Sequence, residues 1–252
     1  MISIDRVSKS YGDLLVLDTV TVDLPAGGVT CLIGPNGAGK STLLSIVARL
    51  LGSDAGTVTV GGLDVTKVNS RELARTMAVL RQDTHLTVRL TVRDLVCFGR
   101  FPHNGGRPTP ADWQAVAKAI EWMDLGDLAE RRLDEMSGGQ RQRAFVAMVL
   151  AQDTPYVLLD EPLNNLDMTH ATAMMRRLRA VADELGRTIV IVLHDVNYAS
   201  CWADSILALR DGAVAAHGRP REIMTTEVLE QVYGWPIPVH DVDGRRLALY
   251  YT

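Results

Sequence analysis

The chain of 252 residues is 47% hydrophobic and 22% charged, which is ordinary for a globular protein and allows one large domain or two small ones. Its formal net charge of −4 argues against a general nucleic-acid-binding protein, because it implies no basic face. Three scattered cysteines, Cys31, Cys97 and Cys201, provide neither a disulfide framework nor metal-ligand spacing, so they fit a reducing cytosol.

No stretch of the sequence is typical of a leader or a membrane span. The N-terminus lacks a basic region followed by an apolar one, and no apolar run approaches the ~18 residues that a bilayer requires. We therefore expect a cytoplasmic chain that does not cross a membrane itself but could dock onto a membrane protein.

The N-terminal residues predict two strands. Residues 2–8 and 16–24 both alternate apolar and polar side chains, as half-buried strands do. The apolar positions expected on one face of the second strand are Val16, Val20, Val22 and Leu24. Between the two strands lies Tyr11, which is either a strand-end aromatic or a stacking surface for a nucleotide base, since stacking needs only a flat π-face.

A glycine-rich loop follows an apolar strand and precedes a helical pattern within residues 28–50. Residues 34–41 fit G-x-x-x-x-G-K-[ST], the phosphate-binding loop. Its glycines let successive backbone N–H groups turn toward an anion, and the helix N-terminus adds further N–H groups. Lys40 can reach the β- and γ-phosphates, and the Ser41 hydroxyl is placed to ligate Mg²⁺. The sequence therefore predicts a nucleotide-binding site.

The middle of the chain changes from mixed to helical composition. We predict strands at 57–60 and 77–80, helices at 71–76 and 91–96, a loop at 101–108, and a helix that ends at Met123. Thr109 is the expected N-cap of that last helix, and Pro110 its first residue. We interpret residues 84–150 as a helical subdomain inserted into an α/β core.

A second glycine-bearing helix N-terminus occurs at residues 136–140, Met-Ser-Gly-Gly-Gln. The helix behind it, residues 141–150, is expected to bury Phe145, Val146, Val149 and Leu150. Such a loop offers a serine hydroxyl and backbone N–H groups to a phosphate. Taken alone, this is a weak signal.

Two acidic residues end the apolar strand predicted at residues 156–159. Ligands bind at the carboxyl edge of an open α/β sheet, so Asp160 is suited to hold Mg²⁺ and Glu161 to polarise an attacking water. The alternative is a solvated acidic strand end. Asp167 either caps the next helix or reaches a partner subunit.

The continuous apolar run at residues 188–193 predicts a strand covered on both faces. It ends at His194, which is a candidate for sensing a γ-phosphate because it follows a core strand. Asp-Gly pairs at 211–212 and 243–244 predict two hairpins, with strands at 237–242 and 245–251 flanking the second. Residues 225–233 are expected to be helical.

The order of these motifs resembles the ATP-binding cassette (ABC) ATPases over essentially the whole chain. The likeness rests on the phosphate loop, Gln82, the Ser137–Gln140 signature, the Asp160-Glu161 pair, Asp167 and His194. It implies a single ABC ATPase domain over residues 1–252, with an α/β P-loop NTPase core. The core would comprise residues 1–83 and 151–252, with an N-terminal antiparallel β subdomain and the inserted helical subdomain at 84–150.

The resemblance also implies a role for each motif. Tyr11 stacks on adenine. The residues that cradle the phosphates are Gly34, Pro35, Asn36, Gly37, Ala38, Gly39, Lys40, Ser41 and Thr42. The residues that cover the γ-phosphate held by another protomer are Ser137, Gly138, Gly139 and Gln140. Met136 stands where leucine is commoner in this family, a modest apolar exchange.

Further implied roles concern the reaction itself. Asp160 supports Mg²⁺ together with Ser41, Glu161 is the general base, and His194 contacts the γ-phosphate. Gln82 links Mg²⁺ and the nucleophilic water to the transport subunits. Asp167 makes contacts across the dimer.

One phosphate loop and one signature imply a homodimer, because each site of this family needs both motifs from different protomers. ATP then bridges two faces, and hydrolysis removes the γ-phosphate contacts that join them. The implied cofactors are ATP and Mg²⁺. The implied partners are integral-membrane permease subunits, a second copy and, indirectly, a substrate-binding lipoprotein, with no nucleic acid. The expected location is the cytoplasmic face of the cell membrane.

A narrower likeness concerns cargo. Residues 99–103 resemble importers of ferric siderophores, haem and cobalamin, and residues 163–168 and 228–234 look most like the ferric-siderophore members. These stretches touch no cargo, so cargo is inferred from kinship. The same resemblance makes residues 83–107 the expected docking surface for cytoplasmic helices of the permease.

We therefore expect the ATP-hydrolysing subunit of a ferric-siderophore importer. The first alternative keeps this role and changes the cargo to haem, cobalamin or another metal chelate. A second is a soluble ABC ATPase acting on ribosomes or DNA, although such proteins resemble tandem cassettes or carry long coiled-coil insertions. A third is an exporter ATPase, which is often fused to membrane helices.

Overall fold

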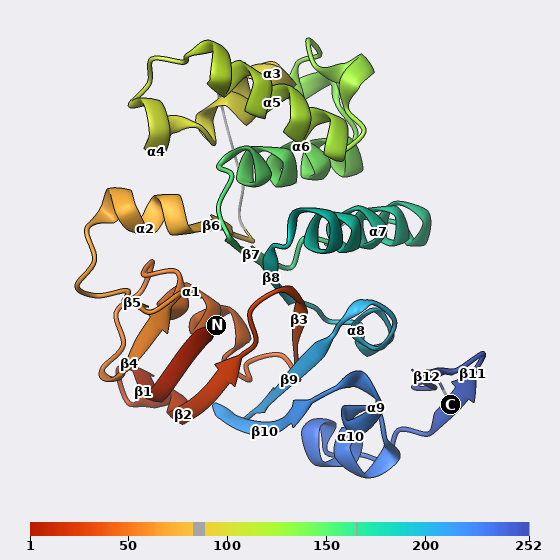
Figure 1. Ribbon diagram of the computed structural model, residues 1–252. Coiled ribbons are helices and arrows are strands. Elements are labelled where there is room, and N and C mark those ends of the chain that lie inside the picture. The colour runs from red at the N-terminus through yellow and green to blue at the C-terminus, as the bar shows by residue number, and fades with distance from the viewer. Residues whose placement is uncertain (83–88, 165, 252) are drawn as a thin grey trace. The chain divides into compact units, whose positions relative to one another are not determined.

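The computed structural model describes residues 1–82, 89–164 and 166–251 (Figure 1). The chain divides into two compact units, one of Met1–Val68 with Thr188–Thr252 and one of Asn69–Arg187. Each unit is described below by itself. The predicted start of the helical subdomain, residue 84, lies outside the described residues.

The first unit contains an antiparallel sheet with strand order β2-β1-β4-β5, which confirms the predicted N-terminal β subdomain. The bounds are Ile2–Tyr11 for β1, Leu14–Leu24 for β2, Ala55–Val60 for β4 and Leu63–Asp64 for β5. In β2 the prediction for Val16 is wrong. Val16 is half-buried and Leu17 is buried in its place, because the register of β1 and β2 shifts near Lys9 and Thr19 has a φ of 50°.

The same unit contains the strand that leads into the phosphate loop. Strand β3 (Gly28–Ile33) pairs in parallel with β8 (Thr188–Val192) on one side and with β9 (Ser205–Arg210) on the other. All residues of β8 are buried, as its continuous apolar run predicts. Strand β10 (Ala213–Gly218) returns antiparallel to β9 through the predicted Asp-Gly turn. Helix α1 (Lys40–Val47) follows β3, and helix α8 (Val196–Trp202) follows β8.

Two short helices and a hairpin complete the first unit. They are α9 (Pro220–Ile223), α10 (Thr226–Tyr233), β11 (Val239–Val242) and β12 (Arg245–Ala248). The hairpin turn has φ values of 51° at Asp243 and 76° at Gly244, the left-handed conformations that an Asp-Gly turn favours. The second hairpin is thereby confirmed, with shorter strands than predicted.

The second unit contains two parallel strands, β6 (Met77–Leu80) and β7 (Tyr156–Asp160), whose register pairs Met77 with Tyr156. Helix α2 (Ser70–Thr76) leads into β6. Helix α7 (Met168–Leu185) follows β7 at an interval and buries one apolar face, which includes Met174 and Leu178.

Three helices of the second unit pack against one another: α3 (Val92–Phe98), α5 (Pro110–Trp122) and α6 (Gly138–Ala151) (Figure 1). Between α5 and α6 lie two 3₁₀ turns, η1 (Gly126–Leu128) and η2 (Leu133–Glu135). The predicted cap at Thr109 is confirmed, because its side chain and that of Asp112 form a reciprocal capping box. The prediction that Leu150 is buried is wrong, since it is only half-buried.

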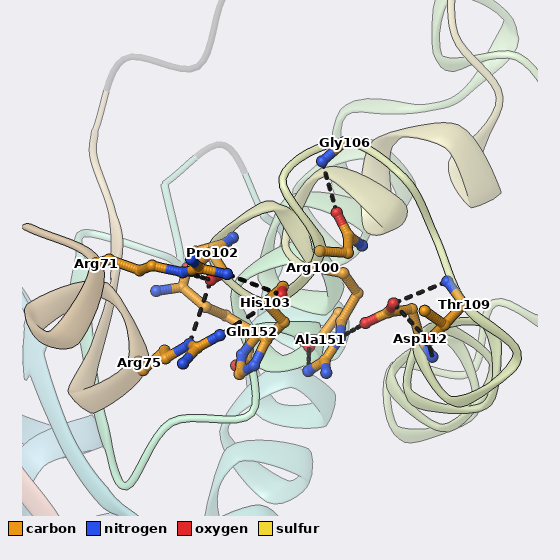
Figure 2. A network of polar contacts seen from close by, with 11 residues as sticks. Arg71, Arg75, Arg100, Pro102, His103, Gly106, Thr109, Asp112, Ala151 and Gln152 are labelled. Carbon is orange, nitrogen blue, oxygen red and sulfur yellow. Dashed lines mark hydrogen bonds and ion pairs between the residues drawn. The ribbon is translucent and has the colours of Figure 1, made fainter.

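The structure also corrects the loop predicted at residues 101–108, because Phe101–Asn104 form a short helix, α4. A polar network holds this segment in place (Figure 2). Arg71 and Arg75 of α2 donate to the Pro102 carbonyl at 3.3 Å, and the His103 ring nitrogen Nε2 lies 2.8 Å from the Gln152 carbonyl.

A buried ion pair joins α5 to the end of α6 in the same network (Figure 2). Arg100 Nε lies 2.9 Å from Asp112 Oδ1, and Arg100 Nη1 donates to the Ala151 carbonyl at 2.8 Å. Arg100 is 9% exposed and Asp112 is 3% exposed. Hydrogen bonds from the Thr109 backbone, and then from the Thr109 and Arg100 side chains, hold the pKa of Asp112 well below its usual range.

In the part of the chain that the structure describes, no helix has both the length and the apolar character needed to span a bilayer.

Candidate nucleotide-binding and hydrolysis site

The predicted phosphate loop connects β3 to α1 in the first unit. Lys40, the first residue of α1, is only 5% exposed. Its ammonium nitrogen donates to the carbonyl oxygens of Gly34 at 2.8 Å and Pro35 at 2.9 Å. The loop therefore holds its own cation at the end of a core strand, which is the arrangement that positions a lysine over phosphates.

Two glycines of this loop are required by the fold around it. A Cβ atom at Gly34 would lie 2.1 Å from the Leu209 carbonyl oxygen, and one at Gly39 would lie 2.8 Å from the Val16 carbonyl oxygen. Both residues also have positive φ values, 141° and 94°. Gly39 is the N-cap of α1, so no side chain caps that helix. The start of α1 thus has the chemistry of an anion site.

Tyr11 is the last residue of β1, and its side chain is 52% exposed. The Lys9 ammonium lies 5.9 Å from the ring centroid. The strand-end interpretation is therefore correct as to position. The exposed ring is also able to stack on a base.

His194 follows β8 and is exposed. The backbone around it is held on both sides. Leu193 N–H donates to the Leu32 carbonyl at 3.0 Å, and the Asp195 carboxylate caps α8 by accepting from Asn197 N–H at 2.8 Å. The imidazole is thus presented from the carboxyl end of a core strand, as the sequence predicts.

The acidic pair in the second unit is buried. Asp160 ends β7, and both Asp160 and Glu161 are 8% exposed, which excludes a solvated acidic strand end. Glu161 Oε2 accepts a hydrogen bond from Gln82 Nε2 at 2.7 Å and another from Asn164 Nδ2. Glu161 also has a φ of 51°. A buried carboxylate on strained backbone is typical of a functional site.

Asn164 is a residue that the sequence did not single out as functional. Its amide reaches Glu161 because Asn164 N–H donates to the Glu161 carbonyl at 3.2 Å in the turn after β7. A turn-forming residue three positions after an acid is a local signal that could have found it.

The predicted signature lies at the N-terminus of α6, where Ser137 is the N-cap and is exposed. Gln140 N–H donates to the Ser137 hydroxyl at 3.2 Å, and Ser137 N–H donates to Gln140 Oε1 at 3.1 Å. Gly138 has no atom within 4 Å of the place that a Cβ would take. The signature residues are therefore accessible, and two of them satisfy each other.

Asp167 caps α7, which confirms the first of its two predicted interpretations. One carboxylate oxygen accepts from both His170 N–H and His170 Nδ1, each at 2.8 Å. The His170 backbone N–H and then its side chain lower the pKa of Asp167.

The predicted site residues thus belong to both units. Tyr11, residues 34–42 and His194 lie in the first unit. Gln82, residues 137–140, Asp160, Glu161 and Asp167 lie in the second. The structure brings Gln82 and Glu161 together although 79 positions separate them.

The donor groups fit Mg²⁺, which prefers hard oxygen ligands. Ser41 offers a hydroxyl, Asp160 a carboxylate and Gln82 an amide oxygen. Among residues 1–82, 89–164 and 166–251, no three His, Cys, Asp or Glu side chains gather as metal ligands. Mg²⁺ at a nucleotide needs only one or two carboxylates, since phosphates and waters complete its shell.

Comparison with known proteins gives consistent likenesses. Residues 17–164 match the ABC transporter family. The petrobactin import ATP-binding protein YclP of Bacillus subtilis is 47% identical over 252 residues, all of both chains. The petrobactin import ATP-binding protein FatE of Bacillus anthracis is 50% identical over 99% of this chain and 100% of its own length.

Solved structures show the same fold. The dimeric structure of MJ0796, a bacterial ABC transporter cassette, has a TM-score of 0.78 and 28% identity, covering 88% of this chain and 99% of that one. A dimeric post-hydrolysis state of the same cassette, bound to ADP and Pi, has a TM-score of 0.78 and 27% identity and covers 88% and 99% of the two chains. The predicted fold class, an α/β P-loop NTPase core, is confirmed.

Proposed function

The chain belongs to the ABC transporter family and is an ATP-hydrolysing cassette, and from that premise we propose that it powers import of a ferric siderophore through a membrane permease. One observation carries the cargo: two petrobactin import ATP-binding proteins are 47% and 50% identical over essentially their whole length. The cassette contacts nucleotide and permease only, so kinship is the argument for cargo.

In this proposal ATP binds at the start of α1. Residues 34–42 cradle its phosphates, with Lys40 at the β- and γ-phosphates, and Tyr11 stacks on the adenine. Ser41 and Gln82 would hold Mg²⁺ with Asp160, directly or through water. The ion, when bound, neutralises charge on the phosphate oxygens.

Glu161 is the general base for the attacking water. The Gln82 and Asn164 amides both donate to its Oε2 atom, which fixes the carboxylate and leaves Oε1 as the oxygen to receive a proton from water. His194 contacts the γ-phosphate from the end of β8. Hydrolysis then removes the γ-phosphate contacts.

A second copy of this chain completes each site. Cassettes of this family form dimers, and this chain has one phosphate loop and one signature. Ser137, Gly138, Gly139 and Gln140 of one protomer cover the γ-phosphate bound by the other, and Asp167 makes contacts across the dimer. The exposed N-terminus of α6 supports this arrangement.

The permease docks on residues 83–107, of which 83–88 lie outside the described residues. In the described portion, Phe98 is 55% exposed and Phe101 is 61% exposed. The network of Figure 2 holds the second of these on a defined helix, α4, and exposed aromatic side chains are favourable at protein interfaces. The chain would thus lie at the cytoplasmic face of the membrane, with a substrate-binding lipoprotein as an indirect partner.

This proposal keeps the chain as one ABC ATPase domain. Residues 84–150 form the helical subdomain, inserted between core segments 1–83 and 151–252. The packing of α3, α5 and α6 on one another supports that division.

Uptake of radioactive iron tests the cargo. Cells that lack this chain would be complemented with the wild type or with Glu161→Gln, and supplied with ferric petrobactin and other ferric siderophores. We expect uptake of at least one siderophore to return with the wild type alone. Uptake that is indifferent to the deletion would overturn the siderophore proposal while leaving the ATPase intact, and haem and cobalamin would be tested next.

A further inference from the structure

The C-terminal hairpin is hydrogen-bonded to the helix that follows His194. The Asn197 side chain of α8 binds Ala248 of β12 in both directions: Ala248 N–H donates to Asn197 Oδ1 at 2.7 Å, and Asn197 Nδ2 donates to the Ala248 carbonyl at 3.1 Å. One turn further along α8, the Ser200 hydroxyl donates to the Arg246 carbonyl. Figure 1 shows α8 beside the hairpin. Since α8 begins two residues after His194, the hairpin constrains the turn that carries this histidine.

The hairpin is itself fixed to the rest of the first unit. Arg246 Nη1 donates to the Arg221 carbonyl at 2.9 Å and to the Met224 carbonyl at 3.3 Å, and Arg221 Nη2 donates to the Gly244 carbonyl at 3.3 Å. These bonds connect β12 and its turn to α9. The hairpin is therefore a rigid support for α8 rather than a loose tail.

Tyr250, just beyond β12, contacts the residue next to His194. Its hydroxyl is hydrogen-bonded to the Asp195 carboxylate, and burial together with the Asp195 charge raises the pKa of Tyr250. The hydroxyl thus remains protonated and donates. Asp195 uses the same carboxylate group to cap α8, so Tyr250 and Asn197 N–H hold one side chain between them.

The same C-terminal segment reaches the phosphate loop. Tyr233, the last residue of α10, has a buried hydroxyl, and burial raises its pKa to about 12 while the Gly34 backbone acts against that rise. Gly34 is the residue whose carbonyl oxygen accepts from Lys40. Residues 225–251 therefore lie against both nucleotide-facing elements of the first unit.

We propose that Tyr250 and Asn197 are positioning residues for His194, so that the C-terminal segment sets where the imidazole meets the γ-phosphate. The inference rests on the γ-phosphate contact of His194 in the proposed function. His194 is exposed, and its own side chain contributes little to fixing its place. The bonds at Asp195 and Asn197 are what restrict the turn.

The first test uses Tyr250→Phe and Asn197→Ala in the subunit assembled with its permease. The control is Leu249→Ala, because the Leu249 side chain is 46% exposed and its N–H bond to the Pro238 carbonyl does not depend on the side chain. We expect each test variant to lower kcat of ATP hydrolysis roughly three- to tenfold, the loss of about one hydrogen bond, with the Kd for ATP unchanged. Turnover equal to that of the control in both test variants would overturn the proposal.

A second readout separates positioning from general destabilisation. Hydrogen exchange of the subunit alone should be faster at residues 193–197 in the two test variants and unchanged in the control. Faster exchange spread over the whole chain, with a matching fall in Tm, would overturn the proposal in favour of a merely structural role.

His194→Ala distinguishes failure of this inference from failure of the proposed function. If His194→Ala keeps wild-type turnover, the proposed role of His194 fails and the positioning role fails with it. If His194→Ala loses turnover while Tyr250→Phe keeps it, only the positioning inference fails. We expect the Tyr250→Phe effect on kcat to disappear when His194 is already alanine, because Tyr250 acts through it.

Discussion

The N-termini of α1 and α6 both carry glycines and a hydroxyl residue, yet they are built in opposite ways. Gly39 precedes α1, where no side chain caps the helix and the buried Lys40 is held by the loop's own carbonyls. At α6 the exposed Ser137 caps the helix in a reciprocal box with Gln140. The first end is arranged around an anion before any ligand arrives, whereas the second satisfies its own polar groups.

This difference indicates which event each end serves. A phosphate can bind at α1 using the chain alone. At α6 a phosphate must replace a cap worth about 1 kcal/mol, so binding there needs the stronger field of a γ-phosphate presented by a second protomer. Binding and dimer formation are thereby separated into two steps of one cycle.

The largest expected effect is on Glu161→Gln. The amide retains the shape that Gln82 and Asn164 hold but cannot accept a proton from water, so turnover should fall by roughly 10²- to 10⁴-fold. Binding of ATP should be retained, because α1 is unchanged, and the ATP-bound dimer should accumulate. Single-turnover kinetics measure the rate, and near-wild-type turnover would remove Glu161 from the role of base.

Lys40→Ala should break the first half of the comparison. Removing a charged donor to two phosphates is expected to weaken ATP binding by roughly 100-fold. Calorimetric titration with ATP and Mg²⁺ measures this affinity. Unchanged affinity would contradict the assignment of residues 34–42 as the phosphate cradle.

Asp112→Asn tests the scaffold that carries α6. Leaving Arg100 buried without its carboxylate should lower the free energy of unfolding by about 3 kcal/mol, measured by urea denaturation at pH 7. The pKa of Asp112 is depressed in the folded chain, so its contribution is present above its unfolded pKa of about 3.9 and is lost as the pH falls below that value. The wild type and the variant should therefore converge in acid, and a constant difference down to pH 2 would contradict the account.

Ser137→Ala has the smallest effect on stability and sharpens the comparison most. Loss of the cap should cost about 1 kcal/mol of unfolding free energy. The matched control is Thr91→Ala, which removes an equivalent capping box from α3, where no nucleotide contact is expected. We expect similar stability losses in both variants and a loss of ATP turnover only in Ser137→Ala. Equal turnover in the two would mean that the signature serine is a cap and nothing more.

Local patterns predicted most of the site, because its parts are short motifs on single elements. The phosphate loop needs only a strand, glycines and a helix start, and the Thr109 cap follows from its spacing before Pro110. The contact between Gln82 and Glu161 could not be predicted from spacing, since it depends on β6 and β7 pairing in parallel across 79 positions.

Other differences have equally physical causes. The shift from Val16 to Leu17 arises at a register irregularity that an alternating pattern does not encode. The helix at Phe101–Asn104 depends on side chains of α2 that lie about thirty positions earlier. The Ser137–Gln140 box, in contrast, has the spacing of a capping box and could have been predicted directly.

Hydrogen exchange of the Glu161→Gln chain with ATP and Mg²⁺ tests the central claim, that this chain binds nucleotide at α1 and completes each site through the signature of a second copy. Amides of residues 34–42 should become protected at every protein concentration once ATP saturates. Amides of residues 137–141 should become protected only as protein concentration rises and dimers form. Protection of both segments in dilute monomer, or protection of the signature without that of the phosphate loop, would contradict the account.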